Sequence, residues 1–373
     1  MKNAVIRGYY GECNAGDDAF MVISAWGALK FCNCGRVYAT TKSIPETHGI
    51  PIKNLYYERD FRGSTRLNRM WDHWICKHST NIISGGGSNF HTTAEMQSYS
   101  KLLDLAPQGK HFAIGVSIGP FRDTDAEDAC AKLLNQFSFV GVRDRYSYDR
   151  ARALVAAPHV ELTFDIAPLL SSATGMSISE DTISRRGFGI SLCNYERFVK
   201  HDTELESKRL ENVADAIRSC AAKGFLDEIV LIDFNSHPLK GDHFVHQELR
   251  SRIEDCVKVR HIAYSGDPVM TMQNIANLKG ILAMRLHAAV FAFCVKTPVL
   301  MLAYHEKCHG WADMIGLPSG LLKSATQSDS EEIAHGIEQL LCSTPQLPSL
   351  TPDDAIERAF RNWHGIQKII QSY

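Results

Sequence analysis

The chain has 373 residues, two to three times the usual length of one domain, so two domains with separate cores are expected. Hydrophobic residues make up 45% of the chain and charged residues 22%, shares that exclude a disordered, collagen-like or coiled-coil protein. The formal net charge is -2, from 40 Lys and Arg against 42 Asp and Glu. Because no block of one sign stands out, the sequence argues against a broad nucleic-acid-binding surface.

Signals for export or membrane insertion are weak. The N-terminus has only a short apolar stretch before Arg7, and the longest apolar run, Ala288 to Val295, is far shorter than the ~18 residues of a membrane-spanning helix. The 11 cysteines are scattered and form no CxxC pair, which is typical of a reducing compartment. These features predict a cytoplasmic protein.

In the first half of the chain, short apolar runs alternate with longer segments of helical period, the pattern of parallel strands joined by crossover helices. The predicted strands are Asn3–Arg7, Val37–Thr40, Asn81–Ser84, His111–Val116 and Phe139–Val142. Between the first two, apolar residues from Ala19 to Gly27 are spaced for a helix with one buried face. The polar stretch Ser171–Arg186 has no sustained period and is the predicted linker.

The same pattern restarts after the linker. The predicted strands are Gly187–Leu192, Glu228–Asp233, Lys258–Ala263, Gly280–Ala283 and Val299–Ala303, and the predicted helices are Glu204–Lys223, Asp267–Asn277, Leu286–Val295 and a final amphipathic helix, Asp354–Ile370. We therefore expect an N-terminal Rossmann-like domain (1–172), a linker (173–186), a C-terminal Rossmann-like domain (187–350) and a C-terminal helix (351–373) that packs back on the first domain.

Ligands of open parallel sheets bind beyond the carboxyl ends of the strands, where helix N-termini offer free N–H groups. The glycine-containing turn Gly8–Ala19 follows the first predicted strand and opens a helix. In it, Asn14 and Asp17 are placed to cap the helix or to contact a ligand. The alternative is an ordinary turn with Asp17 as the N-cap, and spacing alone does not decide between them.

A second glycine turn, Ser84–His91, follows another predicted strand. Its consecutive glycines, Gly86 and Gly87 among them, let the backbone approach a ligand that any side chain would block, and Asn89 and His91 could then bond to hydroxyl groups. The alternative is that the glycines mark only a close crossing of strand and helix.

Arg143 stands at the end of the buried strand Phe139–Val142, where its guanidinium is placed to bind an anion. The alternative is an ion pair with Asp144 or Asp149. Considered alone, a single arginine is more often explained by such a pair.

Arg285 and His287 form the most informative pair in the sequence, because they stand where the apolar strand Gly280–Ala283 gives way to a helix. An arginine fork matches carboxylate or phosphate oxygens, the helix N-terminus adds N–H donors, and an imidazole can donate or shuttle a proton. The arrangement predicts an anion pocket; the alternative is that His287 is a core histidine.

The next predicted strand, Val299–Ala303, is followed by Tyr304, His305, Glu306 and Lys307, which we expect beside the Arg285 turn. Lys307 could hold phosphate or could be a solvated surface lysine. Several metal-ligating residue types crowd this segment, but their spacing matches neither a helical i,i+4 pair nor a zinc finger, so we predict no metal site.

These segments together resemble the polysaccharide pyruvyl transferase family. The motifs that carry the resemblance, in chain order over residues 8 to 310, are GYYGECNAGDDA, SGGGSNF, GVSIGPF, VGVRDRYS, TFDIAPLL, MRLHAAVFA and AYHEKCHG. The resemblance implies two Rossmann-like domains facing one another across a cleft, the GT-B arrangement. It also implies transfer of a pyruvyl group from phosphoenolpyruvate to a sugar, with a cyclic ketal as product and phosphate released.

Carried over by motif, Arg143, Arg285, Leu286 and His287 are the positions expected to hold phosphoenolpyruvate, and Lys307 is a further donor-binding candidate. Arg143, Arg285 and His287 are the expected catalytic residues. The glycine turns of the first domain are expected to face the acceptor sugar. Phosphoenolpyruvate is the donor substrate, and no cofactor is implied.

Two positions depart from the family pattern. Cys193 stands where similar sequences often have an arginine, and His91 matches no position of the pattern. Among the groups that could move protons, His287 is the expected proton-transfer group or phosphate partner, while Asp17 and Glu306 are lesser candidates for activating a hydroxyl.

The acceptor is not defined by the sequence. The resemblance leaves open whether it is a free glycan or a lipid-linked precursor, and with it whether the protein associates peripherally with the inner face of the membrane. Two other functions remain: a nucleotide-sugar glycosyltransferase of GT-B shape, which would also need cations near a diphosphate, and a catalytically silent sugar-binding subunit.

Overall fold

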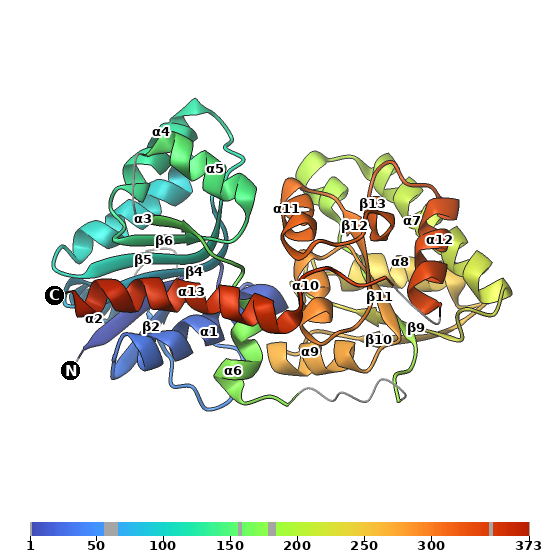
Figure 1. The fold of residues 1–373 in the computed structure, drawn as a ribbon, viewed down its shortest axis with the longest axis horizontal. Coiled ribbons are helices and arrows are strands. Elements are labelled where there is room, and N and C mark those ends of the chain that lie inside the picture. Colours follow the sequence, from blue (N-terminus) through green and yellow to red (C-terminus); the bar gives the residue numbers. More distant parts are fainter. Residues whose placement is uncertain (1, 56–65, 156–158, 178–183, 343–345, 373) are drawn as a thin grey trace. The chain divides into compact units, whose positions relative to one another are not determined.

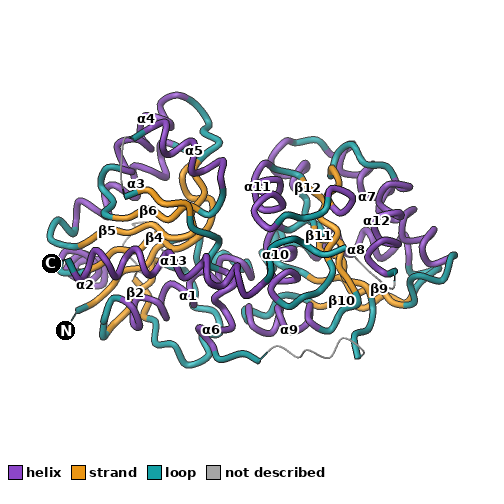
Figure 2. The backbone as a smooth tube through the Cα atoms, viewed as in Figure 1, coloured by secondary structure: helices purple, strands orange, loops and turns teal. Residues whose placement is uncertain are grey.

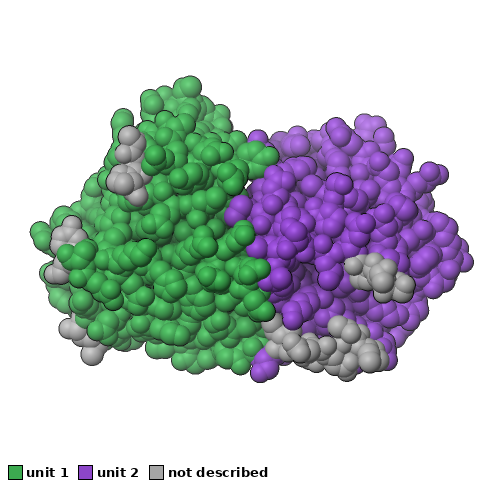
Figure 3. Space-filling view, in the orientation of Figure 1, with its two compact units in different colours: residues 1–12, 16–176, 353–373 green, residues 13–15, 177–352 purple. Residues whose placement is uncertain are grey.

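The computed structural model describes residues 2–55, 66–155, 159–177, 184–342 and 346–372. The chain divides into two compact units, coloured separately in Figure 3: unit 1 comprises Met1–Glu12, Gly16–Met176 and Asp353–Tyr373, and unit 2 comprises Cys13–Ala15 and Ser177–Pro352. Each unit contains one parallel sheet with helices packed against it (Figures 1 and 2), which confirms the predicted α/β class.

The sheet of unit 1 has seven parallel strands in the order β3-β2-β1-β4-β5-β6-β7. The strands are β1 (Asn3–Arg7), β2 (Arg36–Thr40), β3 (Lys53–Leu55), β4 (Asn81–Phe90), β5 (Lys110–Ile118), β6 (Phe139–Val142) and β7 (Val160–Leu162). The strand order reverses on either side of β1, as in doubly wound sheets, where this reversal opens a crevice at the carboxyl ends.

The helices of unit 1 are α1 (Ala15–Phe31), α2 (Arg66–Lys77), α3 (Thr93–Leu105), α4 (Thr124–Leu134), α5 (Arg145–Leu154), α6 (Leu170–Thr174) and α13 (Pro352–Gln371), with a 3₁₀ turn at Ala167–Leu169. Leu102, Leu133 and Ala151, from α3, α4 and α5, share one apolar cluster with Val116 and Val140 of the sheet. These three helices therefore cover one face of the sheet (Figure 1).

Helix α13 is joined to unit 1 by a buried asparagine. The Oδ1 atom of Asn362 accepts hydrogen bonds from the backbone N–H of Gly115 at 3.0 Å and from the hydroxyl of Thr163 at 2.9 Å, and its amide donates to the carbonyl of Phe164 at 3.1 Å. These bonds satisfy the polar groups of a fully buried side chain and fix the helix in register against the strands.

The sheet of unit 2 has six parallel strands in the order β10-β9-β8-β11-β12-β13. They are β8 (Phe188–Ser191), β9 (Glu228–Ile232), β10 (Lys258–Ile262), β11 (Gly280–Ala283), β12 (Val299–Ala303) and β13 (Leu322–Ser324). The helices are α7 (Thr203–Ala222), α8 (His243–Ile253), α9 (Pro268–Ala276), α10 (Leu286–Cys294), α11 (Glu306–Ile315) and α12 (Ser330–Leu341), with a π-helical turn at Glu196–Lys200 and a 3₁₀ turn at Ser319–Leu321.

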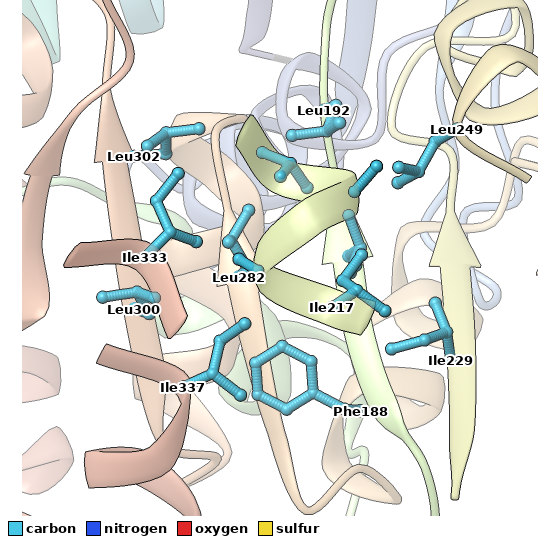
Figure 4. Packing of buried hydrophobic residues seen from close by; sticks show 14 of the residues in the cluster. Phe188, Leu192, Ile217, Ile229, Leu249, Leu282, Leu300, Leu302, Ile333 and Ile337 are labelled. Carbon is cyan, nitrogen blue, oxygen red and sulfur yellow. The ribbon is translucent and has the colours of Figure 1, made fainter. Parts of the chain in front are cut away.

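The core of unit 2 lies between its sheet and helices α7, α8 and α12. Figure 4 shows Phe188 and Leu282 of the strands packed against Ile217 of α7 and Ile337 of α12, all of them buried. Burying one such aliphatic side chain stabilises the fold by about 1.5–3 kcal/mol, so this cluster is a major source of the unit's stability.

Each of the ten predicted strands is present. Among the described residues, three further strands were not predicted: β3, β7 and β13. Each is three residues long and lies at an edge of its sheet. The predicted linker Ser171–Arg186 begins inside α6, whose five residues end at Gly175 in the left-handed conformation. Among the described helices, none combines the length and apolar character needed to span a membrane.

Candidate functional site

Three neighbouring strands of unit 2 end at one edge of its sheet. β11 pairs in parallel with β8 (Ala283 with Ser191) and with β12 (Ala283 with Met301), so the segments that follow these strands emerge side by side. They carry Cys193, Arg285 and Lys307, and the charges of the two cations both act on the Cys193 thiol. The segments that carry the predicted anion-binding residues therefore lie at one end of the sheet of unit 2, and anion binding there stays a prediction.

Arg285 is held by an aspartate that sequence reasoning did not find. Its Nε donates to the two carboxylate oxygens of Asp242 at 3.0 and 3.1 Å, and its Nη2 donates to Oδ1 of the same residue. The Asp242 side chain is 1% exposed, while that of Arg285 is 21% exposed. The ion pair therefore anchors the arginine from the buried side and leaves part of the guanidinium accessible.

Asp242 is itself fixed by the backbone. It precedes α8, and its Oδ2 accepts hydrogen bonds from the N–H groups of Phe234 and Asn235, each at 2.9 Å. A carboxylate held by two backbone donors and a guanidinium has little rotational freedom. Asp242, in the segment that follows β9, therefore fixes the orientation of the Arg285 guanidinium.

The state of Arg285 suits an anion ligand. Burial by itself would lower its pKa, but the Asp242 carboxylate and the neighbouring Cys193 raise the pKa above the usual arginine value, so the side chain stays cationic. Its hydrogen bonds use Nε and Nη2, and Nη1 has no hydrogen-bond partner among the described residues. That edge of the fork remains able to donate to an oxyanion.

Leu286 and His287 occupy the first turn of α10, directly after Arg285, which takes the N-cap position. Leu286 is buried, whereas His287 is half-buried with its ring centroid 6.5 Å from that of Phe291. The first backbone N–H groups of a helix have no intrahelical acceptor and favour an anion. The predicted combination of arginine, imidazole and helix N-terminus is therefore present in one turn.

Lys307 lies in the first turn of the next helix, α11. Its Nζ is 5.3 Å from the centroid of the Tyr304 ring, and its backbone N–H donates to Nδ1 of the N-cap residue His305 at 3.3 Å. Glu306, the first residue of α11, is exposed. Burial raises the pKa of Tyr304 well above its usual range, so the phenol beside the cations stays neutral.

Cys193, which stands where the family pattern often has an arginine, is buried two residues after the end of β8. Burial raises the pKa of its thiol to about 11, although the charge of Arg285 acts in the opposite direction. The thiol is therefore protonated near neutral pH and adds no charge to the site.

Arg143 is tied into unit 1 by several bonds. Its Nη1 is 3.1 Å from Oδ2 of Asp165, its Nε donates to the hydroxyl of Ser117 at 2.6 Å, and its Nη2 donates to the hydroxyl of Ser88 at 3.2 Å. The side chain is only 5% exposed. An internal ion pair is thus present, as the alternative interpretation held, but the closest carboxylate is that of Asp165.

The two carboxylates named in that alternative have other positions. Asp144 is 3.9 Å from Arg143 and serves mainly as the N-cap of α5, accepting from the N–H of Ser147 at 2.8 Å. Burial raises the pKa of Asp165, and the charge of Arg143 lowers it less. An anion that binds Arg143 would therefore lie close to the Asp165 carboxylate, and Arg143 is less accessible than Arg285.

The glycine turn of β4 is explained in part by packing. A Cβ atom at Gly86 would lie 2.4 Å from the Phe20 ring of α1, and one at Gly85 would lie 1.9 Å from the Ser24 hydroxyl. Gly86 and Gly87 also have φ values of +70° and +87°, which favour glycine. The close crossing of strand and helix accounts for Gly85 and Gly86 without a ligand.

The other predicted acceptor residues are dispersed. Asn14 belongs with Cys13 and Ala15 to unit 2, where it forms an antiparallel bridge with Asn235, and Asp17 lies in the first turn of α1. The Nδ1 atom of His91 is 3.0 Å from the carbonyl of Pro120. Asn89 is part of β4, and its side chain is outside the part of the chain that the structure describes.

One group of described side chains, Asp233, His246 and His261, has ligand atoms close enough together for a metal ion. Oδ1 of Asp233 is 2.6 Å from Nδ1 of His246 and 2.9 Å from Nε2 of His261, while the N–H of Leu192 donates to Nε2 of His246 at 3.0 Å. Because Nε2 accepts that bond, Nδ1 carries the hydrogen and donates to Asp233. The geometry therefore favours a hydrogen-bond network, and the absence of a metal site stays a prediction.

Asp242 is the main residue that the sequence analysis missed; Asp165 lies in the motif TFDIAPLL, but its pairing with Arg143 was not predicted. Asp242 had a local signal, since an aspartate directly before a helix is a common N-cap. Its pairing with Arg285 depends on the packing of β9 beside β8, which spacing along the chain does not reveal.

Comparison with known proteins identifies solved structures with a similar fold. Among solved structures, the chain is similar to UDP-GlcNAc 2-epimerase from Methanocaldococcus jannaschii (TM-score 0.63, 14% identity, 100% of each chain covered). It is also similar to UDP-GlcNAc 2-epimerase from Neisseria meningitidis bound to UDP-GlcNAc (0.60, 11%, 99% of this chain and 100% of that one). A UGT transferase from Siraitia grosvenorii in complex with UDP matches with TM-score 0.54, 10% identity and 100% of each chain covered.

These likenesses confirm a fold of the GT-B type and, at such identities, show the fold alone. The search of curated proteins gave no match. The family profile described as polysaccharide pyruvyl transferase matches residues 14–306. The chain therefore belongs to the polysaccharide pyruvyl transferase family.

Proposed function

We propose that this chain transfers a pyruvyl group from phosphoenolpyruvate to a sugar of a polysaccharide or of its lipid-linked precursor, forming a cyclic ketal and releasing phosphate. The observation that carries the proposal is the cation cluster, Arg285 and Lys307, which follows the carboxyl ends of the neighbouring strands β11 and β12. There Arg285 is oriented by Asp242 and keeps one edge of its guanidinium for an anion. Membership of the family supports a transferase with a sugar or polysaccharide acceptor.

The donor would be held by its two anionic groups. Arg285 and the N-terminus of α10 suit one of them, and Lys307 with the N-terminus of α11 suits the other. Leu286 would supply apolar contact beside them. Arg143 remains a donor-binding and catalytic candidate of lower rank, because Asp165 already neutralises it.

The reaction balances with the groups available. A proton delivered to the methylene carbon of phosphoenolpyruvate makes C2 electrophilic, and the oxygen of one sugar hydroxyl bonds to C2 and loses its proton. The bond from C2 to the phosphate oxygen then breaks, phosphate leaves, and a second hydroxyl adds to C2 and loses its proton. One of the two hydroxyl protons replaces the proton given to the methylene carbon, and the other leaves with phosphate.

His287 is the proposed proton-transfer group or phosphate partner, because imidazole exchanges protons near neutral pH and this residue lies in the first turn of α10, two positions after Arg285. Asp17 and Glu306 are secondary candidates for activating a hydroxyl. We expect His287→Ala to lower turnover by at least about a hundredfold with an unchanged unfolding midpoint. The matched control is His309→Ala, an exposed histidine of α11, and a fully active His287→Ala protein would remove the proposed role.

Two other functions are tested by two further measurements. Thermal unfolding is followed with phosphoenolpyruvate, with UDP-GlcNAc, and with neither. Stabilisation by the nucleotide sugar alone would favour a glycosyltransferase, in line with the nucleotide ligands named for the similar structures. Phosphate release from phosphoenolpyruvate with a sugar acceptor would exclude a silent sugar-binding subunit.

A lipid-linked acceptor would bring the protein to a membrane surface. Helix α2 carries three exposed apolar side chains, Met70, Trp71 and Trp74, and the two indole rings stack at 5.1 Å. Exposed tryptophans together with Lys77, an exposed lysine in the last turn of the same helix, suit the interface of an anionic bilayer. Binding to vesicles of phosphatidylglycerol, lost in Trp71→Ser/Trp74→Ser, is the expected result; equal sedimentation of both proteins would contradict it.

A further inference from the structure

A cavity of about 230 Å³ lies in unit 1, beyond the carboxyl ends of β1 and β2. The turn after β1 forms one wall, the end of β2 and the residues after it form a second, and α3 forms a third. The side chains that define its chemistry are Arg7, Tyr9, Glu12, Lys42, Glu95 and Tyr99. A cavity of this size is smaller than the pockets that hold drug-sized ligands, so it suits one compact unit.

Tyr9 is held at this cavity by α3. Its hydroxyl donates to Oε1 of Glu95, whose Oε2 accepts from the N–H and the hydroxyl of Thr92 at 2.9 and 3.0 Å in a capping box. Burial and the Glu95 carboxylate raise the pKa of Tyr9 above the usual range, so the phenol stays neutral. The side chain is nevertheless 43% exposed, which leaves a fixed aromatic surface open to a ligand.

The remaining walls carry balanced charge. The Arg7 guanidinium lies 4.4 Å from the centroid of the buried Tyr99 ring and donates to the carbonyl of Ser98 at 3.1 Å. Lys42 forms an ion pair with Glu12, and both side chains are largely exposed. The lining thus contains two cations, Arg7 and Lys42, and two carboxylates, Glu12 and Glu95, so its formal charges cancel.

This chemistry fits a sugar ring better than a phosphate. The apolar C–H face of a pyranose packs on an aromatic ring, its hydroxyls donate to carboxylates and accept from ammonium or guanidinium groups, and it needs no net positive charge. A doubly charged phosphate ester would meet two carboxylates in a lining whose formal charges cancel, which disfavours its binding. The cavity is thus chemically distinct from the cation cluster of unit 2.

We infer that this cavity binds one pyranose unit of the acceptor glycan, an inference that rests on the proposed function. Tyr9 provides the stacking surface, and Glu12 and Lys42 bond to hydroxyls at the rim. The turn after β1 was expected from the sequence to contact the acceptor, but through Asn14 and Asp17. The cavity instead offers Tyr9, Glu12 and Lys42. The other expected contacts, Gly86, Gly87, Asn89 and His91, are not among its lining residues.

The test uses the 373-residue chain and a panel of methyl glycosides of galactose, glucose, mannose and N-acetylglucosamine. Saturation-transfer NMR without phosphoenolpyruvate reports which glycoside binds and which of its protons face the protein. We expect Tyr9→Ala to weaken that binding by about tenfold and Tyr9→Phe, which keeps the ring, to change it less than about threefold. Lys42→Met is expected to weaken binding, whereas Lys101→Met, an exposed lysine of α3 outside the lining, is not.

The outcomes separate this inference from the proposed function. Glycoside binding that depends on Tyr9, without any phosphate release from phosphoenolpyruvate, would overturn the pyruvyl transfer but not the sugar site. Turnover with an acceptor KM unchanged in Tyr9→Ala would overturn the sugar site but not the transfer. A wild-type protein that binds none of the four glycosides at millimolar concentration would also overturn the inference.

Discussion

At the scale of single residues, the account depends on how each arginine is paired. Arg285 and Arg143 both form ion pairs with aspartates that are 1% exposed, yet Arg285 itself is 21% exposed and Arg143 only 5%. A buried ion pair contributes little net stability, but removing one partner leaves the other as an uncompensated buried charge. The aspartate of the accessible pair is therefore a positioning residue, because it holds the cation without covering it.

Asp242→Asn tests this at the residue scale. The asparagine can keep a carbonyl oxygen at the Oδ2 position, where both backbone N–H groups donate, but it removes the charge opposite Arg285. We therefore expect the free energy of unfolding to fall by about 2 kcal/mol. Urea denaturation measures the change. The matched control is Asp329→Asn, the exposed N-cap of α12, where about 0.5 kcal/mol or less is expected. Equal effects of the two substitutions would contradict the special role of Asp242.

Some of these residues could be predicted from the sequence, but their ion-pair partners could not. Arg285, His287 and Lys307 were predicted together because residues that follow adjacent parallel strands emerge at one edge. The partners Asp242 and Asp165 were not, because each contact joins segments whose proximity arises only from the folded sheet order. Arg143 was placed correctly at a strand end, but its burial could not be known from the strand itself.

At the scale of elements, the strands that were predicted from the sequence have four residues or more, and all but the edge strand β10 lie inside their sheets. A buried strand of four or more apolar residues stands out from its flanks, whereas β3, β7 and β13 have three residues each and mixed burial. Helix α6 was assigned to the linker for the same reason, since five residues are too few to show a helical period. The short elements are fixed by tertiary contacts, which a local pattern does not contain.

The packing of α1 on α13 gives a prediction at this scale. A Cβ atom at Gly27 of α1 would lie 2.0 Å from the ring of Trp363, a fully buried residue of α13. We expect Gly27→Ala to destabilise the protein by about 3 kcal/mol through overpacking, measured by urea denaturation. Trp363→Phe removes the clashing atoms, so the double variant should show a smaller loss than the sum of the two single ones. Additive losses would contradict this packing.

At the scale of the whole molecule, each of the two units contributes a different kind of surface. Unit 2 presents a cation cluster where β11 and β12 end, and unit 1 contains a charge-balanced cavity with an exposed tyrosine. A doubly anionic donor suits the first and a neutral sugar ring suits the second. This division matches a transferase that must recognise two chemically unlike substrates.

The most direct test of the central claim follows the donor carbon. The protein is incubated with the four methyl glycosides and phosphoenolpyruvate isotopically labelled at C2, and carbon and phosphorus NMR record the products. The account predicts that C2 appears as a ketal carbon bonded to two sugar oxygens, with an equivalent of inorganic phosphate, and that Arg285→Ala yields neither. Ketal formation at the wild-type rate by Arg285→Ala would contradict it.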